Sequence, residues 1–312
     1  MMEIPDGKYA GRIVEEPEYE GLASFSSQVG ITNVVDTVVL ANLVDRLGLD
    51  TNESGWIIGW VIECYEKGIL TNKDTDGLEM TWGNTEAIES MVQKIGKRQG
   101  FGDVLAEGVM RASQHVGRGT EDMAVYTKKG CTPRSHDHRV FPGWLELFDT
   151  CVSNTGTLET QFSAPYKILG IPPYKWYDPV EVSTVEARIK GAMMFEDSLG
   201  TCRLNTATNV DLLPKAINMA TGWDMTMEEA MMVGRRAINQ ARVYNLRCGI
   251  SGEFDEPSLR YGSTPQDGPA VGQGIMPHWD KMLRNYYALM GWDEKGKPLP
   301  QTLKSLGLEN II

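Results

Sequence analysis

The apolar residues of this chain recur mostly at helical spacing. Residues 33–47 follow a 3.6-residue period, with Thr32 as the predicted N-terminal cap and Gly48 as the residue that ends the helix. A second helix is predicted from Trp56 to about Lys67, and its two glycines indicate close packing against another element. Further helices are predicted at about 84–98, 103–112, 144–152, 182–197, 211–221, 227–247, 277–290 and 300–306. No strand-rich region is evident, so a mainly α fold is expected.

A change of character divides the chain near its middle. Residues 1–16 are polar and carry no period, which predicts an extended lead-in. Helical patterns follow, and they give way to an aperiodic stretch at 131–139 before helices resume. We therefore predict two helical domains after the lead-in, residues 17–126 and residues 127–312.

The composition is that of a folded protein with no nucleic-acid or membrane signature. The 312 residues are 41% hydrophobic and carry a net charge of −12 with scattered basic residues. No basic stripe suits nucleic acid, and no apolar run reaches the roughly 18 residues of a membrane span. The N-terminus shows no secretory signal, and the five cysteines are odd in number and far apart. Reduced thiols in a cytoplasmic protein are therefore expected.

Two motifs of the form Asp-x-x-Gly-x lie at the ends of predicted helices and are the strongest candidates for a ligand site. The first begins at Asp45 and the second at Asp197, and the second ends in Cys202. Glycine lets a ligand approach the backbone, and a carboxylate accepts hydrogen bonds from N–H donors such as those of a pterin ring. The Cys202 thiolate is a soft ligand that suits an iron–sulfur cluster. The pair is interpreted as gripping one ligand from two sides, or alternatively as two ordinary helix caps.

Three further polar clusters are candidate sites, each with a plainer structural alternative. His136 and His138 could move protons or hold an anionic substrate, or could lie in a solvated loop. One carboxylate of the segment Glu18–Glu20 could act as a general acid or base, or both could form an exposed charge pair. The turn Ser153–Glu159 suits either a substrate lining or loop structure alone.

Several large enzyme classes are unsupported by the sequence. It contains no glycine-rich dinucleotide fingerprint, no Walker phosphate loop, no nucleophile elbow and no zincin motif. It also contains no Cys-x-x-Cys pair, so no local motif supplies a zinc site or a full set of cluster ligands.

Together these motifs resemble the C-terminal portion of the aldehyde ferredoxin oxidoreductase family, whose members are tungsten enzymes with two pyranopterins and a [4Fe–4S] cluster. The resemblance runs in order along nearly the whole chain. It rests on 17–22, 45–51, the stretch around Cys64, 100–108, 153–154, 197–202, 291–296 and 306–308. It implies two mainly helical domains, like domains 2 and 3 of that family, that close over the cofactor.

The resemblance also implies roles for individual residues. Cys202 would be the one cluster ligand in this chain, and Thr51 would lie near the metal. Glu20 matches a family acid beside the metal and is expected to handle protons. Contacts to a tungsten (or molybdenum) bis-pyranopterin are implied for Asp45, Gly48, Leu49, Asp50, Asp197, Leu199 and Gly200.

Two departures from the family pattern shape the expectation. The other cluster cysteines and the β-rich N-terminal base domain would precede Pro17, and both are missing. A separate partner chain is expected to bring them, unless the sequence is truncated. Where many members have a histidine, this chain has Glu159, which changes the proton chemistry, and His136 or His138 could compensate.

The expected function is the C-terminal half of a tungstopterin-dependent oxidoreductase. It would oxidise a small aldehyde to a carboxylate and pass electrons through the cluster at Cys202 to a ferredoxin-like acceptor. Two alternatives stay open: a low-potential reductase like the benzoyl-coenzyme A reductases of the same family, or a helical interaction or scaffold domain without cofactor.

Overall fold

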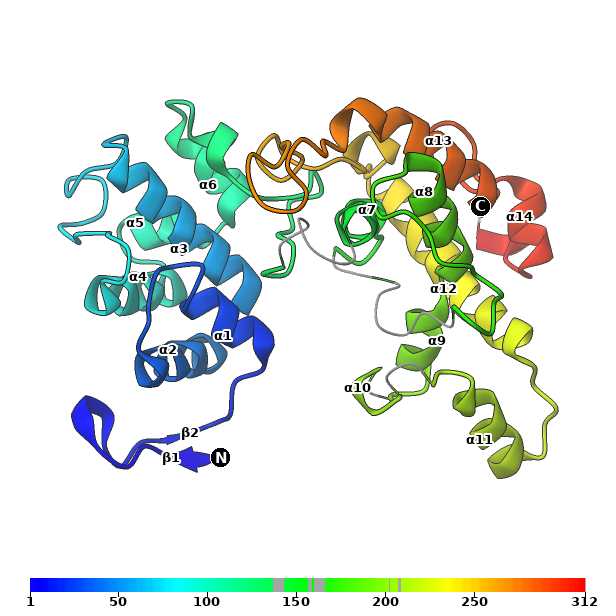
Figure 1. Ribbon diagram of the computed structural model, residues 1–312, viewed down its shortest axis with the longest axis horizontal. Helices are drawn as coiled ribbons and strands as arrows, with labels where there is room; N and C mark the ends of the chain where they lie inside the picture. The colour runs from blue at the N-terminus through cyan, green and yellow to red at the C-terminus, as the bar shows by residue number, and fades with distance from the viewer. Residues whose placement is uncertain (137–142, 157–158, 160–165, 202, 207–208, 312) are drawn as a thin grey trace. The chain divides into compact units, whose positions relative to one another are not determined.

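The structure, a computed structural model, describes residues 1–136, 143–156, 159, 166–201, 203–206 and 209–311, with no side-chain description for Arg203 and Leu204. Helices dominate this part of the chain, so the predicted mainly α fold is confirmed. The chain divides into two compact units (Figure 1). Unit 1 holds residues 1–136 and 257–261, and unit 2 holds the rest of the described chain.

Unit 1 is a group of helices preceded by a short hairpin. The strands β1 (Met2–Glu3) and β2 (Ile13–Val14) pair antiparallel, with Met2 opposite Val14. The hairpin packs its apolar side chains on Val38 and Val39 of α2 (Val34–Leu47). Residues 1–16 are mostly polar and show no period. Their three buried side chains, Ile4, Tyr9 and Val14, are nevertheless enough to fold the segment as a hairpin against the helix. The elements are β1 (Met2–Glu3), η1 (Gly7–Tyr9), β2 (Ile13–Val14), α1 (Tyr19–Phe25), α2 (Val34–Leu47), α3 (Thr51–Glu66), α4 (Thr85–Lys97), α5 (Phe101–Leu105), α6 (Val109–Val116) and η2 (Thr120–Met123).

Side-chain caps set the ends of the two central helices. Asn33, and not the predicted Thr32, caps α2 by accepting hydrogen bonds from two backbone N–H groups. The predicted start of the next helix at Trp56 is also wrong. Asp50 accepts the N–H of Glu53 at 2.7 Å, so α3 begins at Thr51.

Two further differences from the predicted helices have local causes. The helix predicted at 103–112 is two helices, α5 and α6, because Gly108 holds a backbone conformation (φ +86°) that interrupts the pattern. Helix α1 was not predicted, because its buried residues are mostly small and give a weak apolar period.

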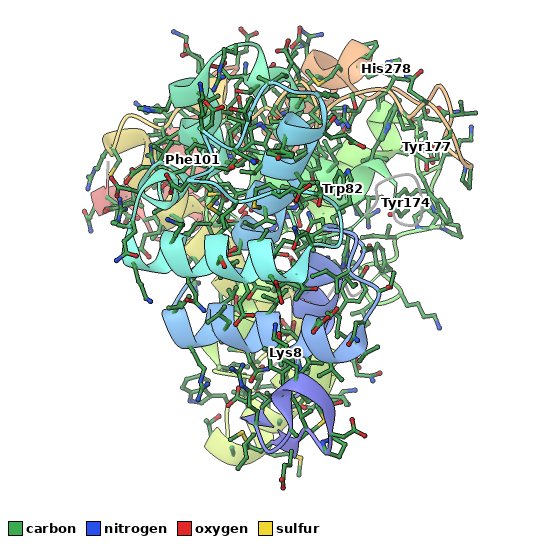
Figure 2. All side chains as sticks on the ribbon, turned by 90° about the vertical axis from the view of Figure 1, so that its left-hand side faces the viewer. Lys8, Trp82, Phe101, Tyr174, Tyr177 and His278 are labelled. Atoms are coloured by element: carbon green, nitrogen blue, oxygen red, sulfur yellow. The ribbon has the colours of Figure 1, made fainter. Side chains whose placement is uncertain are left out.

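The glycines of α3 allow α1 to approach closely, as the sequence predicts. A Cβ atom at Gly55 would lie 2.6 Å from the Cβ of Ser24, and one at Gly59 would lie 3.1 Å from the carbonyl oxygen of Gln28. Figure 2 looks onto this unit and shows α4 and α2 side by side, with the N-terminal hairpin beyond α2. Lys8 on the hairpin forms long ion pairs with two glutamates of α4.

Unit 2 is organised around one long helix and a wholly buried one. The long helix begins with the capping box predicted for Thr226 and Glu229, which is present. Helix α8 (Pro179–Ile189) packs on α13 (Trp279–Met290), and α9 (Ala192–Ser198) packs on α12 (Met227–Arg247). The elements are α7 (Trp144–Val152), α8 (Pro179–Ile189), α9 (Ala192–Ser198), α10 (Arg203–Thr206), α11 (Leu212–Thr221), α12 (Met227–Arg247), η3 (Gly252–Phe254), η4 (Met276–His278), α13 (Trp279–Met290), α14 (Pro300–Ser305) and η5 (Glu309–Ile311).

The single helix predicted at 182–197 is wrong, because the chain breaks between α8 and α9. Gly191 adopts φ +107° at this break, and its carbonyl lies against the backbone of Gly234 in α12. No side chain fits between the two glycines. The break turns the chain so that α9 runs along α12.

Candidate functional site

The two Asp-x-x-Gly motifs form the same turn in each unit. The N–H of Gly48 donates to the carbonyl of Asp45, and the N–H of Gly200 donates to the carbonyl of Asp197, both at 3.0 Å. The two glycines have φ of +66° and +67°. Both turns lie at the C-terminal end of a helix, so the alternative interpretation as helix caps describes their backbone correctly.

The side chains of these turns remain available for a ligand. Asp45 and Asp197 are exposed, and neither carboxylate forms a hydrogen bond or ion pair with the described residues. A Cβ atom at Gly48 or Gly200 would meet nothing within 4 Å, so the space over each turn is open. Leu199 is also exposed. Exposed carboxylates beside an open backbone turn suit a planar ligand that presents N–H donors.

The end of the first motif has a structural task as well. The Asp50 side chain caps α3, and its carbonyl accepts the hydroxyl of Ser54. Thr51 is the first residue of α3 and is half-buried. Leu49 donates its N–H to the carbonyl of Val44, which completes the end of α2. These bonds fix the backbone from α2 into α3.

Unit 1 brings together two of the polar clusters predicted from the sequence. An Oε1 atom of Glu20 at the start of α1 lies 3.7 Å from a guanidinium nitrogen of Arg134, and both side chains are mostly buried. The ring of Tyr19 packs edge-on against His136, with centroids 5.1 Å apart. The hydroxyl of Ser135 lies 3.1 Å from that of Ser24 in α1. His138 lies outside the described residues.

The segment around Arg134 is also bonded to α3. Trp56 donates its indole N–H to the carbonyl of Pro133 at 2.8 Å. The carboxylate of Glu53 accepts the N–H of Val109 at 2.5 Å and bonds to Thr132. Burial raises the pKa of Glu53 above its ordinary value, and these hydrogen bonds act in the opposite direction. Glu53 is not among the residues predicted for the site, because in the sequence it is one polar residue of the segment before the helix predicted from Trp56.

Unit 2 contains a buried cluster of charged groups that the sequence analysis missed. The ammonium of Lys190 lies 2.8 Å from Asp149, 2.9 Å from Glu159 and 2.9 Å from Glu186. All four side chains are fully buried. The ring of Tyr286 lies beside them, with its centroid 5.9 Å from the Lys190 nitrogen.

The cluster fixes the protonation of its members. Burial alone lowers the pKa of Lys190, but the three carboxylates outweigh it and hold the pKa well above its ordinary value. Burial raises the pKa of Glu186 well above its ordinary value, and the carboxylate of Asp149 acts in the same direction. The lysine is therefore charged. Burial and the charge of Asp149 both favour the protonated, neutral form of Glu186.

The turn that carries Glu159 is tied to this cluster. Asn154 donates its N–H to Glu159 at 2.8 Å, and Glu159 donates its own N–H to the Asp149 carboxylate. Glu159 was predicted as a catalytic residue on the strength of a family position. In this structure its carboxylate is buried and paired with Lys190, so it can act on a substrate only through its neighbours.

The metal ligands predicted from the sequence lie beyond what the structure describes. Cys202 is outside the described residues, and within those residues no group of three His, Cys, Asp or Glu side chains could hold a metal ion. Four cysteines are described, and none of them forms a disulfide with another described cysteine. In the same part of the chain, no helix combines the length and apolar character needed to cross a membrane.

Comparisons with known proteins give the class of protein. The tungsten-containing aldehyde ferredoxin oxidoreductase of Pyrococcus furiosus is 33% identical over 304 residues, which cover 94% of this chain and 49% of that protein. The enzyme of the same name from Thermococcus kodakarensis is 30% identical over 310 residues, covering 96% and 50%. A Pyrococcus furiosus protein named aliphatic sulfonate oxidoreductase, WOR-like subunit, is 30% identical over 316 residues, covering 97% and 47%. The chain thus spans about half the length of these oxidoreductases.

The family match covers nearly the whole chain. The family described as aldehyde ferredoxin oxidoreductase, domains 2 and 3, matches residues 1–308. The chain belongs to the aldehyde ferredoxin oxidoreductase family, and the predicted resemblance is confirmed. A solved structure, the active site complex BamBC of benzoyl coenzyme A reductase in complex with 1,5-dienoyl-CoA, has the same fold, with a TM-score of 0.73 and 21% identity. The likeness covers 94% of this chain and 49% of that one.

Proposed function

We propose that this chain is the C-terminal half of a tungstopterin-dependent oxidoreductase that oxidises an aldehyde to a carboxylate. The observation that carries the proposal is the match of residues 1–308 to domains 2 and 3 of a family whose relatives are named tungsten-containing oxidoreductases. The open Asp-x-x-Gly turn in each unit supports it, because both turns present an exposed carboxylate that accepts N–H donors.

The proposal gives the two turns the task of holding the cofactor. In unit 1, the residues that would contact a tungsten (or molybdenum) bis-pyranopterin are Asp45, Gly48, Leu49 and Asp50. In unit 2, they are Asp197, Leu199 and Gly200. When bound, this cofactor supplies the two-electron chemistry, and the protein supplies its position and the exclusion of water. The bonds of the turns to α2, α3 and α9 hold the ligand-facing groups in place before the ligand arrives.

Glu20 is proposed to handle the protons of the reaction. Conversion of an aldehyde and water into a carboxylate releases three protons and two electrons, so a group that accepts protons is needed near the substrate. The Glu20 carboxylate is mostly buried and lies 3.7 Å from the guanidinium of Arg134, which holds it in place. Thr51 is assigned to the surroundings of the metal by the family resemblance alone. His136 and His138 are proposed to move protons in place of the histidine that many members have where this chain has Glu159, and Glu159 acts through Lys190.

The electron path and the partners complete the proposal. Cys202 would bind a [4Fe–4S] cluster as the one ligand from this chain, and electrons would leave to a ferredoxin-like acceptor in the cytoplasm. The remaining cluster cysteines and the base domain would come from a separate chain or from a part of the protein that this sequence lacks. The chain's coverage of only about half of its relatives is consistent with this division.

The test is metal analysis of the protein alone and after co-expression with the product of a neighbouring gene that encodes the base domain. The expected result is tungsten and iron in the co-expressed complex, with turnover of an aldehyde coupled to ferredoxin reduction. Absence of tungsten from both preparations would refute the proposal and favour the interaction or scaffold domain. Tungsten with reduction of an aromatic acyl-coenzyme A thioester, and no aldehyde turnover, would favour the low-potential reductase.

A further inference from the structure

The side chain of Asn154 is buried and has no hydrogen-bond partner among the described residues. Its exposed fraction is 9%, and neither Oδ1 nor Nδ2 has a partner in the described part of the chain. A carboxamide loses its hydrogen bonds to water when it is buried, so folded proteins almost always replace them. Asn154 therefore leaves one donor group and one acceptor group for something that binds.

A second asparagine in the same unit shows the ordinary arrangement. Asn239 in α12 is 2% exposed and is bonded at both ends of its carboxamide. Its Nδ2 donates to the carbonyl of Arg235 at 2.9 Å, and its Oδ1 accepts the indole N–H of Trp292 at 2.8 Å. At Asn239, where the buried carboxamide has a structural role, the fold thus provides a hydrogen-bond partner for each of its two ends. The lack of partners at Asn154 is a property of that position.

The backbone of Asn154 is held firmly although its side chain is unpaired. Its N–H donates to Glu159 at 2.8 Å, and its carbonyl accepts Nδ2 of Asn245 in α12 at 2.9 Å. Glu159 is itself paired with Lys190, which Asp149 and Glu186 hold from two helices. This bonding fixes the residue in advance, as a binding group requires. Lys190 is in this sense the positioning residue for Asn154.

We propose that the Asn154 carboxamide binds the edge of a pyranopterin by a paired hydrogen bond, with Nδ2 donating to a ring carbonyl and Oδ1 accepting a ring N–H. The inference rests on the proposed function, which supplies the cofactor. A pterin ring presents donors and acceptors side by side, as an amide does, so it satisfies both orphaned groups. An aldehyde substrate offers only an acceptor and would leave Oδ1 without a partner.

Asn154→Leu separates this role from a structural one, because leucine has the same branching and the same number of heavy atoms. Removing an unpaired carboxamide does not weaken the folded chain, so the melting temperature is expected to stay unchanged or to rise by about 2 °C or more. In the co-expressed complex, pterin released as its fluorescent oxidised form is expected to fall at least tenfold per chain. Asn154→Ala tests the same loss of hydrogen bonds without added apolar contacts.

Asn239→Leu is the matched control, and it is expected to lower the melting temperature by about 4 °C or more because it leaves the buried indole N–H of Trp292 without its acceptor. A fall of the same size in Asn154→Leu would overturn the inference, since it would show that the carboxamide has a structural partner. Full pterin content in both Asn154 variants would overturn it as well. A wild-type complex that contains no pterin would instead refute the proposed function, and the ligand named here with it.

Discussion

The ammonium nitrogen of Lys190 lies 2.8 Å from a carboxylate oxygen of Asp149, and neither side chain is exposed to solvent. Glu159 and Glu186 reach the same nitrogen at 2.9 Å. Water does not screen charges at this depth, so the negative charge of these acidic groups depends on the lysine for its compensation. One side chain at the end of α8 thus joins α7, α8 and the turn that carries Glu159.

Replacement of Lys190 by methionine keeps the length of the side chain and removes its charge. The buried acidic groups around Lys190 then lose the cation that compensates their negative charge, and the free energy of unfolding is expected to fall by about 3–5 kcal/mol. Urea unfolding of wild type and variant measures the difference. Lys215→Met is the control, because Lys215 is exposed and pairs with Asp211 at 3.2 Å on the surface, where the loss is at most about 1 kcal/mol. Losses of equal size would show that the buried cluster contributes no more than a surface ion pair.

Glu186 is expected to make the stability depend on pH. Burial and the charge of Asp149 raise its pKa in the folded state, whereas an unfolded glutamate titrates near pH 4.3 or so. Between these two values the folded chain holds a proton that the unfolded chain has lost. The free energy of unfolding therefore falls as the pH rises through this window, by at most about 1.4 kcal/mol per pH unit.

Glu186→Gln tests this dependence, because glutamine keeps a hydrogen-bond donor and cannot titrate. Urea unfolding at a series of pH values above about 4.3 is expected to show the falling stability in wild type and a flatter profile in the variant. The other titratable groups around Glu186 are Asp149, Glu159, Lys190 and Tyr286. An unchanged slope in the variant would assign the shared proton to one of them.

The helices could be predicted from the sequence where apolar residues recur with a full period, as in α2, α4 and α12. The Lys190 cluster could not. Glu186 and Lys190 are spaced as an ordinary surface pair one turn apart, and burial is set by α7 and α13, which pack on α8 from elsewhere in the chain. One signal was present: Asp149 stands in a helix whose residues are otherwise mostly apolar, where an acid needs a buried partner.

The candidate site was predictable to the extent that local sequence determines it. The turn at Gly48 follows from glycine in the left-handed conformation after a helix, and the same reasoning holds at Gly200. The ion pair of Glu20 with Arg134 joins residues far apart in the chain, so no local pattern reveals it. The missing partners of Asn154 are likewise visible only once the surrounding chain is folded.

The two open glycine turns are expected to respond alike to substitution. Gly48 and Gly200 have φ of +66° and +67°, and an added Cβ would meet nothing within 4 Å. Alanine at either position therefore costs only the backbone strain, about 1 kcal/mol. Asparagine tolerates the left-handed conformation and is expected to cost less. Urea unfolding of the four variants measures these losses, and a much larger loss for one alanine variant would indicate a packing contact at that turn.

Glu20→Gln is expected to lower aldehyde turnover by about 10²–10⁴-fold and to change its pH profile, because glutamine keeps the shape of the side chain and cannot accept a proton. The assembled complex should keep its tungsten content, which separates lost chemistry from lost cofactor. Glu18→Gln is the control, since Glu18 lies two residues away and is exposed. Unchanged turnover with an unchanged pH profile in Glu20→Gln would remove this residue from the proposed mechanism.

Cys202→Ser tests the one cluster ligand assigned to this chain. A serine hydroxyl is a poor ligand for iron compared with a thiolate, so the assembled complex is expected to lose its normal cluster signal in electron paramagnetic resonance and part of its iron. Cys248→Ser is the control, because Cys248 is an exposed free thiol directly after α12. A normal cluster signal in Cys202→Ser would refute its role as a ligand. Loss of the signal in both variants would instead indicate that assembly with the partner chain, and not ligation, had failed.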